Sequence, residues 1–159
     1  MMPHTIQHPI QHWTAKTKTA EKQAFCRQVL EALPDWFGVP EAITDYASAA
    51  KTQDMFVVPE KGFLTLKFHT ETAVELAVMG VLPAYHGQGV GKALIAAATA
   101  HLQKNKMAYF TVKTLAESAN SAPYDATRAF YASQGFVPLE VFPDLWDAHN
   151  PCLLMVKSL

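Results

Sequence analysis

A glycine-rich run between a strand-like and a helix-like segment is the part of this sequence best suited to binding a ligand. The run reads His86-Gly87-Gln88-Gly89-Val90-Gly91-Lys92. Glycines let several backbone N–H groups crowd onto one ligand, and the first turn of a helix adds further N–H groups and the positive end of its dipole. A phosphate or pyrophosphate group is the ligand that this arrangement favours.

Two common phosphate-binding motifs do not fit this run. The P-loop pattern requires Gly and Ser or Thr at positions where this chain has His86 and Ala93. The dinucleotide fingerprint requires a small residue where this chain has Lys92 or Leu94, for the two possible starting glycines. A nucleotide-phosphate enzyme is therefore the weakest of the hypotheses that the loop allows.

Apolar periodicity and turn residues predict the elements that must position the loop. The expected helices cover 18–33, the stretch from Pro40, 92–104 and 124–134; the expected strands cover 55–58, 63–68, 73–81, 109–115, 136–142 and 152–157. Short turns join the first three strands, which is typical of an antiparallel meander. This order predicts an α/β domain with one mixed, mostly antiparallel sheet flanked by helices, and a single domain over residues 1–159.

Three histidines near the N-terminus are spaced like metal ligands on a helix. His4, His8 and His12 recur every four residues, but Pro9 would interrupt such a helix. We therefore expect a short strand or extended arm with solvated histidines, and no metal site.

Composition bounds the remaining function classes. The chain has 159 residues, of which 50% are apolar and 17% charged, which suits one globular domain. The net charge of −1 and the lack of a polybasic stretch give no reason to expect a nucleic acid or a membrane as partner. The N-terminus does not resemble a signal peptide, and the two cysteines, Cys26 and Cys152, belong to no metal or disulfide pattern. We expect a cytoplasmic protein with two buried thiols.

The segment from Val81 to Leu94 resembles the pyrophosphate loop of the GNAT acetyltransferase superfamily, which is usually written Q/R-x-x-G-x-G/A. In this chain it reads Val81-x-Pro83-x-Tyr85-His86-Gly87-x-Gly89-Val90-Gly91-x-x-Leu94. His86 stands at the Q/R position and departs from the pattern. Because the loop acts mainly through backbone amides, the resemblance still implies coenzyme binding.

A second stretch resembles the other hallmark of the superfamily, a helix that ends in F/L-Y-x-x-x-G-F. It reads Thr127-Arg128-Ala129-Phe130-Tyr131-Ala132-Ser133-Gln134-Gly135-Phe136. Tyr124 and Thr127 depart from the Asn and Ala that the family often has there. Both motifs stand in the family's order and spacing, so the resemblance covers roughly residues 55–158. It implies the GNAT fold in a small, single-domain, bacterial-type member.

The resemblance implies transfer of an acetyl group from acetyl-CoA to an amine, with no metal. Tyr131 stands where the family's tyrosine protonates the leaving thiolate. Glu75 is the only acid in the strand over 73–81. It lies eleven residues before His86, and this offset matches the position of the catalytic Glu of histone-type members. A water relay from Tyr85, or acids in other loops, is the alternative base.

The resemblance also assigns the coenzyme contacts. The backbone N–H of Met79 would stabilise the oxyanion, and Met79 and Val81 would pair with the pantetheine arm like an added strand. The full set of expected coenzyme-binding residues is Met79, Val81, His86, Gly87, Gln88, Gly89, Val90, Gly91, Lys92, Thr127 and Phe130.

The acceptor is the least determined part of the hypothesis. Trp36 and Phe37, in a connector between two helices, and Trp146, in a loop between the last two strands, are candidates to line an acceptor cleft. Their alternative role is to seal the core. Acids at 140, 144 and 147 would attract a cationic amine, or would simply be solvated. We expect a small-molecule, amino-acid-derived or peptide amine, and a monomer or homodimer.

A competing hypothesis from another class is a module that binds acyl-CoA without turnover. The departures at His86, Tyr124 and Thr127 favour it, whereas the presence of both Glu75 and Tyr131 argues against it, because a pure sensor needs neither.

Overall fold

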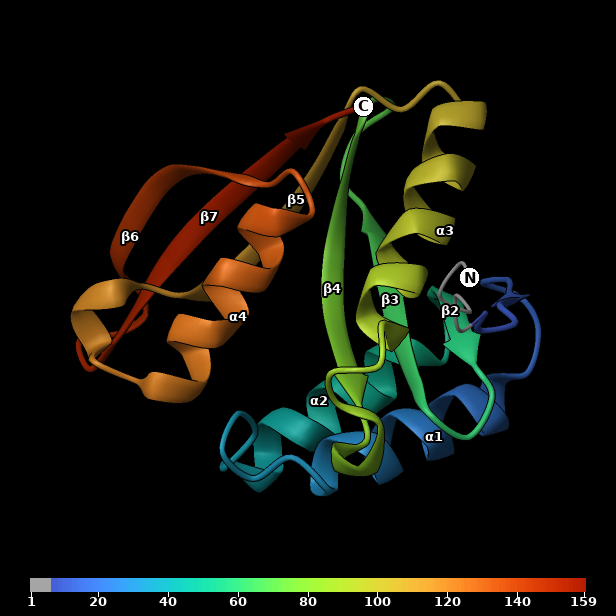
Figure 1. The fold of residues 1–159 in the computed structure, drawn as a ribbon, viewed down its shortest axis with the longest axis horizontal. Helices are drawn as coiled ribbons and strands as arrows, with labels where there is room; N and C mark the ends of the chain where they lie inside the picture. The colour runs from blue at the N-terminus through green and yellow to red at the C-terminus, as the bar shows by residue number, and fades with distance from the viewer. Residues whose placement is uncertain (1–6) are drawn as a thin grey trace, which may run out of the picture. The chain divides into compact units, whose positions relative to one another are not determined.

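A computed structural model describes residues 7–159 (Figure 1). Within this range the chain forms four α-helices, two short 3₁₀ helices and seven strands. In chain order they are β1 (Gln11–Trp13), α1 (Thr19–Glu31), α2 (Pro40–Ala50), β2 (Asp54–Val58), β3 (Gly62–Phe68), β4 (Ala73–Val81), η1 (Pro83–Tyr85), α3 (Val90–Lys104), β5 (Tyr109–Leu115), η2 (Glu117–Ala119), α4 (Ala122–Ser133), β6 (Val137–Asp147) and β7 (Asn150–Ser158).

The described strands follow the order β1-β2-β3-β4-β5-β7-β6. The pairs β1–β2, β2–β3, β5–β7 and β6–β7 are antiparallel. The pair β4–β5 is parallel, with Ala73–Leu76 opposite Tyr109–Val112. A parallel pair needs a long crossover connection, which α3 supplies. The mixed, mostly antiparallel sheet with flanking helices that the sequence predicts is confirmed.

The chain separates into two compact units, each made of two sequence segments. The first takes in the described residues up to Leu66 together with Val78–Ala98, and the second takes in Lys67–Ala77 together with Thr99–Leu159. The glycine loop therefore belongs to the first unit, and the helix that carries Tyr131 belongs to the second. A single domain over residues 1–159 stays a prediction.

The core of the first unit forms where α1 and α2 pack on strands. Its buried side chains are Cys26, Val29, Leu30, Leu33, Ile43, Ala47, Ala50, Met55, Val57, Phe63 and Val78. The members from α1 recur at helical spacing and so share one face. As expected, Pro40 is the first residue of α2, where a missing N–H costs nothing.

Gly80 lets α1 approach the backbone of β4. A Cβ at this position would lie 2.8 Å from Cγ1 of Val29 and 3.1 Å from Cδ1 of Leu33. Only a residue without a side chain leaves room for that approach. The helix pair thus packs directly on the strand that leads into the glycine loop.

Lys22 is a fully buried lysine in the same unit, with 0% of its surface exposed. Its ammonium donates hydrogen bonds to the carbonyl oxygens of Thr14, Ala15 and Gln53, at 2.8, 3.1 and 2.9 Å. These three bonds use all three N–H groups of the ammonium. Burial lowers the pKa of Lys22 from its ordinary value, and the nearby charge of Asp54 opposes that change.

The core of the second unit contains a chain of aromatic rings. The ring of Phe110 on β5 lies 5.3 Å from that of Phe136, which lies 5.7 Å from that of Tyr131 on α4. Gly135 follows α4 with φ +96°, which agrees with its predicted place just past the end of the helix. The aromatic pairs fix how α4 packs on β5.

The last two strands are longer than the sequence suggested. Trp146, Asp147 and Asn150 were expected in a loop, but they lie in β6 and β7. The side chain of Asp147 explains the difference, because its Oδ1 accepts the backbone N–H of His149 at 2.8 Å and the amide of Asn150 at 3.0 Å. These bonds close a tight turn, so polar residues that usually mark a loop extend a hairpin instead.

The sequence predicts solvated N-terminal histidines, but two of them make hydrogen bonds in the structure. Nε2 of His12 lies 2.9 Å from Oδ1 of Asp54, and its ring stacks on Phe56 with the centroids 4.4 Å apart. His8 bonds to the glycine loop, as described below, and His4 lies outside the described residues. No helix within residues 7–159 is long and apolar enough to cross a membrane.

Candidate functional site

The glycine loop connects the end of β4 to the start of α3 and contains two residues with left-handed backbone conformations. Gly87 has φ +74° and Gly89 has φ +82°, a region that side chains disfavour. A Cβ at Gly87 would meet nothing within 4 Å, and one at Gly89 would meet only Nε2 of His8, at 4.0 Å. Glycine is therefore required here by the backbone conformation and not by crowding from the described residues.

The first turn of α3 suits an anion. Its leading N–H groups have no acceptor within the helix, because an α-helix leaves its first four N–H groups unpaired. No acidic side chain lies in this turn, and Lys92 contributes a positive charge. The first backbone bond of the helix runs from the N–H of Ala93 to the carbonyl of Gly89, at 3.0 Å. Loop and helix start together form the kind of cradle that binds phosphate groups.

Two side chains of the loop bond to its own backbone. Nε2 of His86 donates to the carbonyl of Val81 at 2.6 Å, and the ring of Trp36 meets the His86 ring edge-on, with the centroids 5.9 Å apart. The amide of Gln88 donates to the carbonyl of Ala84 at 3.1 Å. The departure at His86 thus has a structural use, because its imidazole fixes the turn between β4 and the glycines.

Glu75 lies in the second unit and is 8% exposed. Its Oε1 lies 2.6 Å from Nε2 of His69 and 3.5 Å from Nζ of Lys113. The side chains of both partners are about one-third exposed, at 38% and 34%. Sequence reasoning missed both, because His69 stands in a turn and Lys113 on another strand, and neither carries a local signal.

Tyr131 is 6% exposed on α4 of the same unit. Glu75 is the register partner of Thr111 on β5, so it faces the side opposite to Phe110. The ring of Phe110 packs on Phe136, and Phe136 packs on Tyr131. Glu75 and Tyr131 therefore lie on opposite faces of the β4–β5 pair.

The other expected coenzyme residues are divided between the units. Met79 and Val81 are half-buried on β4 in the first unit. Thr127 and Phe130 lie on α4 in the second. The hydroxyl of Thr127 donates to the carbonyl of Pro123 at 3.1 Å, one turn earlier in the same helix.

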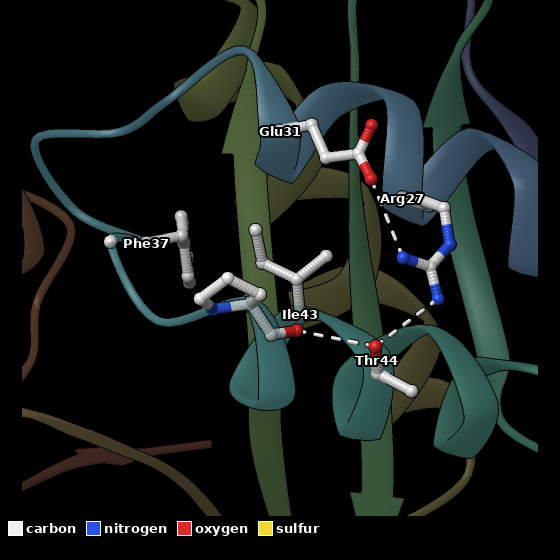
Figure 2. Close-up of a pocket in the computed structure, with 7 residues that line it drawn as sticks. Arg27, Glu31, Phe37, Ile43 and Thr44 are labelled. Atoms are coloured by element: carbon white, nitrogen blue, oxygen red, sulfur yellow. Dashed lines mark hydrogen bonds and ion pairs between the residues drawn. The ribbon is translucent and has the colours of Figure 1, made fainter.

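Phe37 lines a pocket of about 230 Å³ between α1 and α2 (Figure 2). Its charged members are paired with each other, because Nη1 of Arg27 lies 3.4 Å from Oε1 of Glu31. Nη2 of Arg27 also lies 3.4 Å from the hydroxyl of Thr44. Trp36 meets His86 in the same unit, whereas Trp146 is 45% exposed on β6 in the second unit. The structure thus brings Trp36 next to the glycine loop.

Metal and thiol chemistry find little support in the described chain. Within residues 7–159 no group of three His, Cys, Asp or Glu side chains is placed to hold a metal ion. Cys26 and Cys152 are both free and buried, as the sequence predicts. Burial raises the pKa of the Cys26 thiol to about 12.

Comparisons with known proteins identify the family and the fold of the chain. A model of the acetyltransferase (GNAT) domain family matches residues 43–138. A GNAT-family protein from Desulfovibrio desulfuricans has a similar structure, with a TM-score of 0.75 and 18% identity over 94% of this chain and 99% of its own. An aminoglycoside 6'-N-acetyltransferase in complex with coenzyme A has a TM-score of 0.68 and 14% identity over 94% and 96%.

A GNAT-family acetyltransferase from Elizabethkingia anophelis with acetyl-CoA bound has a TM-score of 0.64 and 17% identity over 95% and 97% of the two chains. At these identities the solved structures support the fold alone. A search of curated proteins finds no match. The family match covers more than half of the chain, including the glycine loop and Tyr131, so the chain belongs to the GNAT family of acetyltransferases.

Proposed function

We propose that this protein transfers the acetyl group of acetyl-CoA to a primary amine of a small molecule, an amino acid derivative or a peptide. The observation that carries the proposal is the glycine loop, whose two left-handed glycines lead directly into the first turn of α3. A pyrophosphate is the group that such a cradle fits, and coenzyme A contains one.

The chemistry is a direct displacement. The amine nitrogen bonds to the thioester carbonyl carbon, the carbon–sulfur bond breaks, the nitrogen loses a proton and the sulfur leaves as thiolate. The N–H of Met79 would stabilise negative charge on the carbonyl oxygen, and Met79 and Val81 would align the pantetheine arm. The remaining coenzyme contacts would come from the loop and from Thr127 and Phe130.

Tyr131 and Glu75 would serve different atoms of the reaction. The phenol of Tyr131 would protonate the sulfur, and Glu75 would take the proton from the nitrogen. Both atoms are bonded to the thioester carbonyl carbon during the reaction, so the two side chains would approach that carbon from opposite faces of the β4–β5 pair. Nε2 of His69, which lies 2.6 Å from Oε1 of Glu75, would donate a hydrogen bond that holds this carboxylate in place. A water relay from Tyr85 remains the alternative base.

The acceptor would be bound by aromatic surface, with Trp36, Phe37 and Trp146 as the candidates. We place the protein in the cytoplasm, because the free thiols of Cys26 and Cys152 suit a reducing compartment. Nothing in the charge balance favours a nucleic acid partner.

The decisive experiment compares thermal unfolding with and without acetyl-CoA, followed by a free-thiol assay with a panel of amines on the same sample. Acetyl-CoA at a hundredfold excess over its dissociation constant should stabilise the native state by about 2.7 kcal/mol. Thiol release with one class of amine would establish the reaction and begin to identify the acceptor.

Two controls separate the alternatives. ATP in place of acetyl-CoA tests the nucleotide-phosphate hypothesis, and stabilisation by ATP alone would overturn the assignment of the loop. Stabilisation by acetyl-CoA without thiol release across small, amino-acid and peptide amines would favour the acyl-CoA sensor. The absence of any shift with acetyl-CoA would refute the proposed function.

A further inference from the structure

A hydrogen bond joins His8, in the described part of the N-terminal arm, to the glycine loop. Nε2 of His8 lies 2.7 Å from the carbonyl oxygen of Gln88, a residue 80 positions further along the chain. A carbonyl oxygen can only accept a hydrogen bond, so the imidazole carries its proton on Nε2 and donates it. The arm therefore holds the peptide group that contains the Gln88 carbonyl.

That peptide group, Gln88–Gly89, is one of the two between the left-handed glycines. Gly87 and Gly89, with φ +74° and φ +82°, flank Gln88. Because glycine tolerates many backbone conformations, the peptide that joins Gln88 to Gly89 has little of its own to prevent it from rotating. The described chain contains no cis peptide bond, so the Gln88 carbonyl and the Gly89 N–H point in opposite directions. Holding the carbonyl toward His8 thus aims the Gly89 N–H away from it.

The arm is well anchored for this task. β1 begins three residues after His8 and pairs with β2, with Gln11 opposite Val57 and Trp13 opposite Met55. His12, on β1, bonds to Asp54. Pro9, next to His8, has a fixed φ and limits the freedom of the connection. His8 is therefore presented to the loop by a short link from the sheet.

The other ring nitrogen of His8 is withdrawn from solvent. Nδ1 is buried and has no hydrogen-bond partner in the described structure. Burying a polar atom without a partner is unfavourable. The ring keeps this position while its Nε2 bonds to Gln88, which a solvated histidine would not do.

We infer that His8 is a positioning residue for coenzyme binding, which fixes the Gln88–Gly89 peptide so that the Gly89 N–H faces the pyrophosphate. This inference rests on the proposed function. His8 acts through the loop and leaves the reacting atoms untouched. Its effect is on the affinity for acetyl-CoA, because a loop already held in its binding conformation loses less freedom when the ligand arrives.

Three variants test the inference. His8→Ala removes the donor. His8→Gln places an amide N–H at about the reach of Nε2, whereas His8→Asn carries the same amide one bond shorter. We expect KM and Kd for acetyl-CoA to rise by roughly 3- to 10-fold in the Ala and Asn variants, the equivalent of one neutral hydrogen bond. His8→Gln should stay close to the wild type.

A comparison of KM for acetyl-CoA with kcat separates a positioning role from a general loss of structure. At saturating acetyl-CoA, kcat and the KM for the amine should be unchanged in all three variants, and the ligand-free unfolding midpoint of the Gln and Asn variants should agree. Wild-type affinity for acetyl-CoA in both the Ala and Asn variants would overturn the inference and leave the proposed function intact. A fall in kcat without a change in KM for acetyl-CoA would also overturn it. Failure of the wild type itself to bind acetyl-CoA would instead refute the proposed function.

Discussion

Nε2 of His69 lies 2.6 Å from Oε1 of Glu75, and the ammonium of Lys113 lies 3.5 Å from the same oxygen. The carboxylate proposed as the general base is thus not an isolated group. It belongs to a three-residue cluster in which the imidazole is more exposed than the carboxylate. As a carboxylate, Glu75 can only accept the hydrogen bond from Nε2 of His69, so the imidazole holds it in place, and a substitution at either residue disturbs the other.

Replacing Glu75 with Gln should lower kcat by about 10²- to 10⁴-fold, the usual contribution of a positioned general base. His69→Gln should have a smaller effect, because the carboxylate remains, and should change the pH dependence of kcat/KM. Steady-state kinetics over a range of pH values measures both effects. Full activity of Glu75→Gln would transfer the base role to a water relay or another acid.

Replacing Tyr131 with Phe removes one hydroxyl but keeps the ring that packs on Phe136. We expect kcat to fall by about 10²-fold or more, while Kd for acetyl-CoA measured by calorimetry stays near the wild-type value. Tyr109→Phe is the matched control, because Tyr109 is 51% exposed on β5 and has no proposed role. Equal losses of turnover and coenzyme affinity in Tyr131→Phe would contradict the acid role.

Replacing Gly89 with Val should abolish binding of acetyl-CoA. A β-branched residue is strained at φ +82°, and its Cβ would lie 4.0 Å from Nε2 of His8, so the loop could not keep the conformation that presents its N–H groups. Gly38→Val is the control, because a Cβ there makes one ordinary contact, at 3.5 Å to the carbonyl of Pro34. Normal acetyl-CoA affinity in Gly89→Val, measured by calorimetry, would refute the assignment of the loop.

The buried thiol of Cys26 should make stability fall at high pH. Burial raises its pKa to about 12 from an ordinary value of 9.0, so the unfolded chain loses this proton first as the pH rises. The thiol therefore contributes stability that is present below pH 9 and is lost between about 9 and 12. At pH 10 the loss should be about 1 kcal/mol. Urea unfolding at pH 8 and pH 10 measures it.

The Cys26→Ala variant is the reference for that experiment, because other groups titrate in the same range. Its free energy of unfolding should depend less on pH between 8 and 10 than that of the wild type, and an identical dependence would contradict the prediction. Neither cysteine should react with a thiol reagent in the native protein at pH 8, so the protein adds no background to the free-thiol assay.

The sequence was a good guide where local pattern decides structure. The bounds predicted for β4 and β5, 73–81 and 109–115, match those observed, because alternation and flanking turn residues define a strand locally. The glycine run and Gly135 were also placed correctly. These features depend on backbone conformation, which a few residues determine.

Contacts between distant residues were not predictable in the same way. The bond from His8 to Gln88 spans 80 residues, and that from Lys113 to Glu75 spans 38. The sequence around a histidine or lysine that bonds to a distant residue does not differ from the sequence around one that faces solvent. The predicted length of the β6–β7 hairpin was wrong for a related reason. Asp147 accepts a hydrogen bond within a tight turn, and its residue type alone does not specify that turn.

Lys22 will respond in an unusual way to the protein's own acetyl donor. Thioesters also acetylate lysines without catalysis, and a lowered pKa leaves a larger fraction of the buried Lys22 amine unprotonated than in an ordinary lysine. Yet no part of Lys22 is exposed, so the donor cannot reach it, whereas Lys16 and Lys106 lie on the surface. Peptide mapping after long incubation with acetyl-CoA should find label on the exposed lysines and none on Lys22. Label at Lys22 after incubation of the native protein with acetyl-CoA, without denaturant, would contradict this expectation. Because acetyl-CoA can reach Lys22 only when the first unit opens, the rate of its acetylation would measure how often that unit opens.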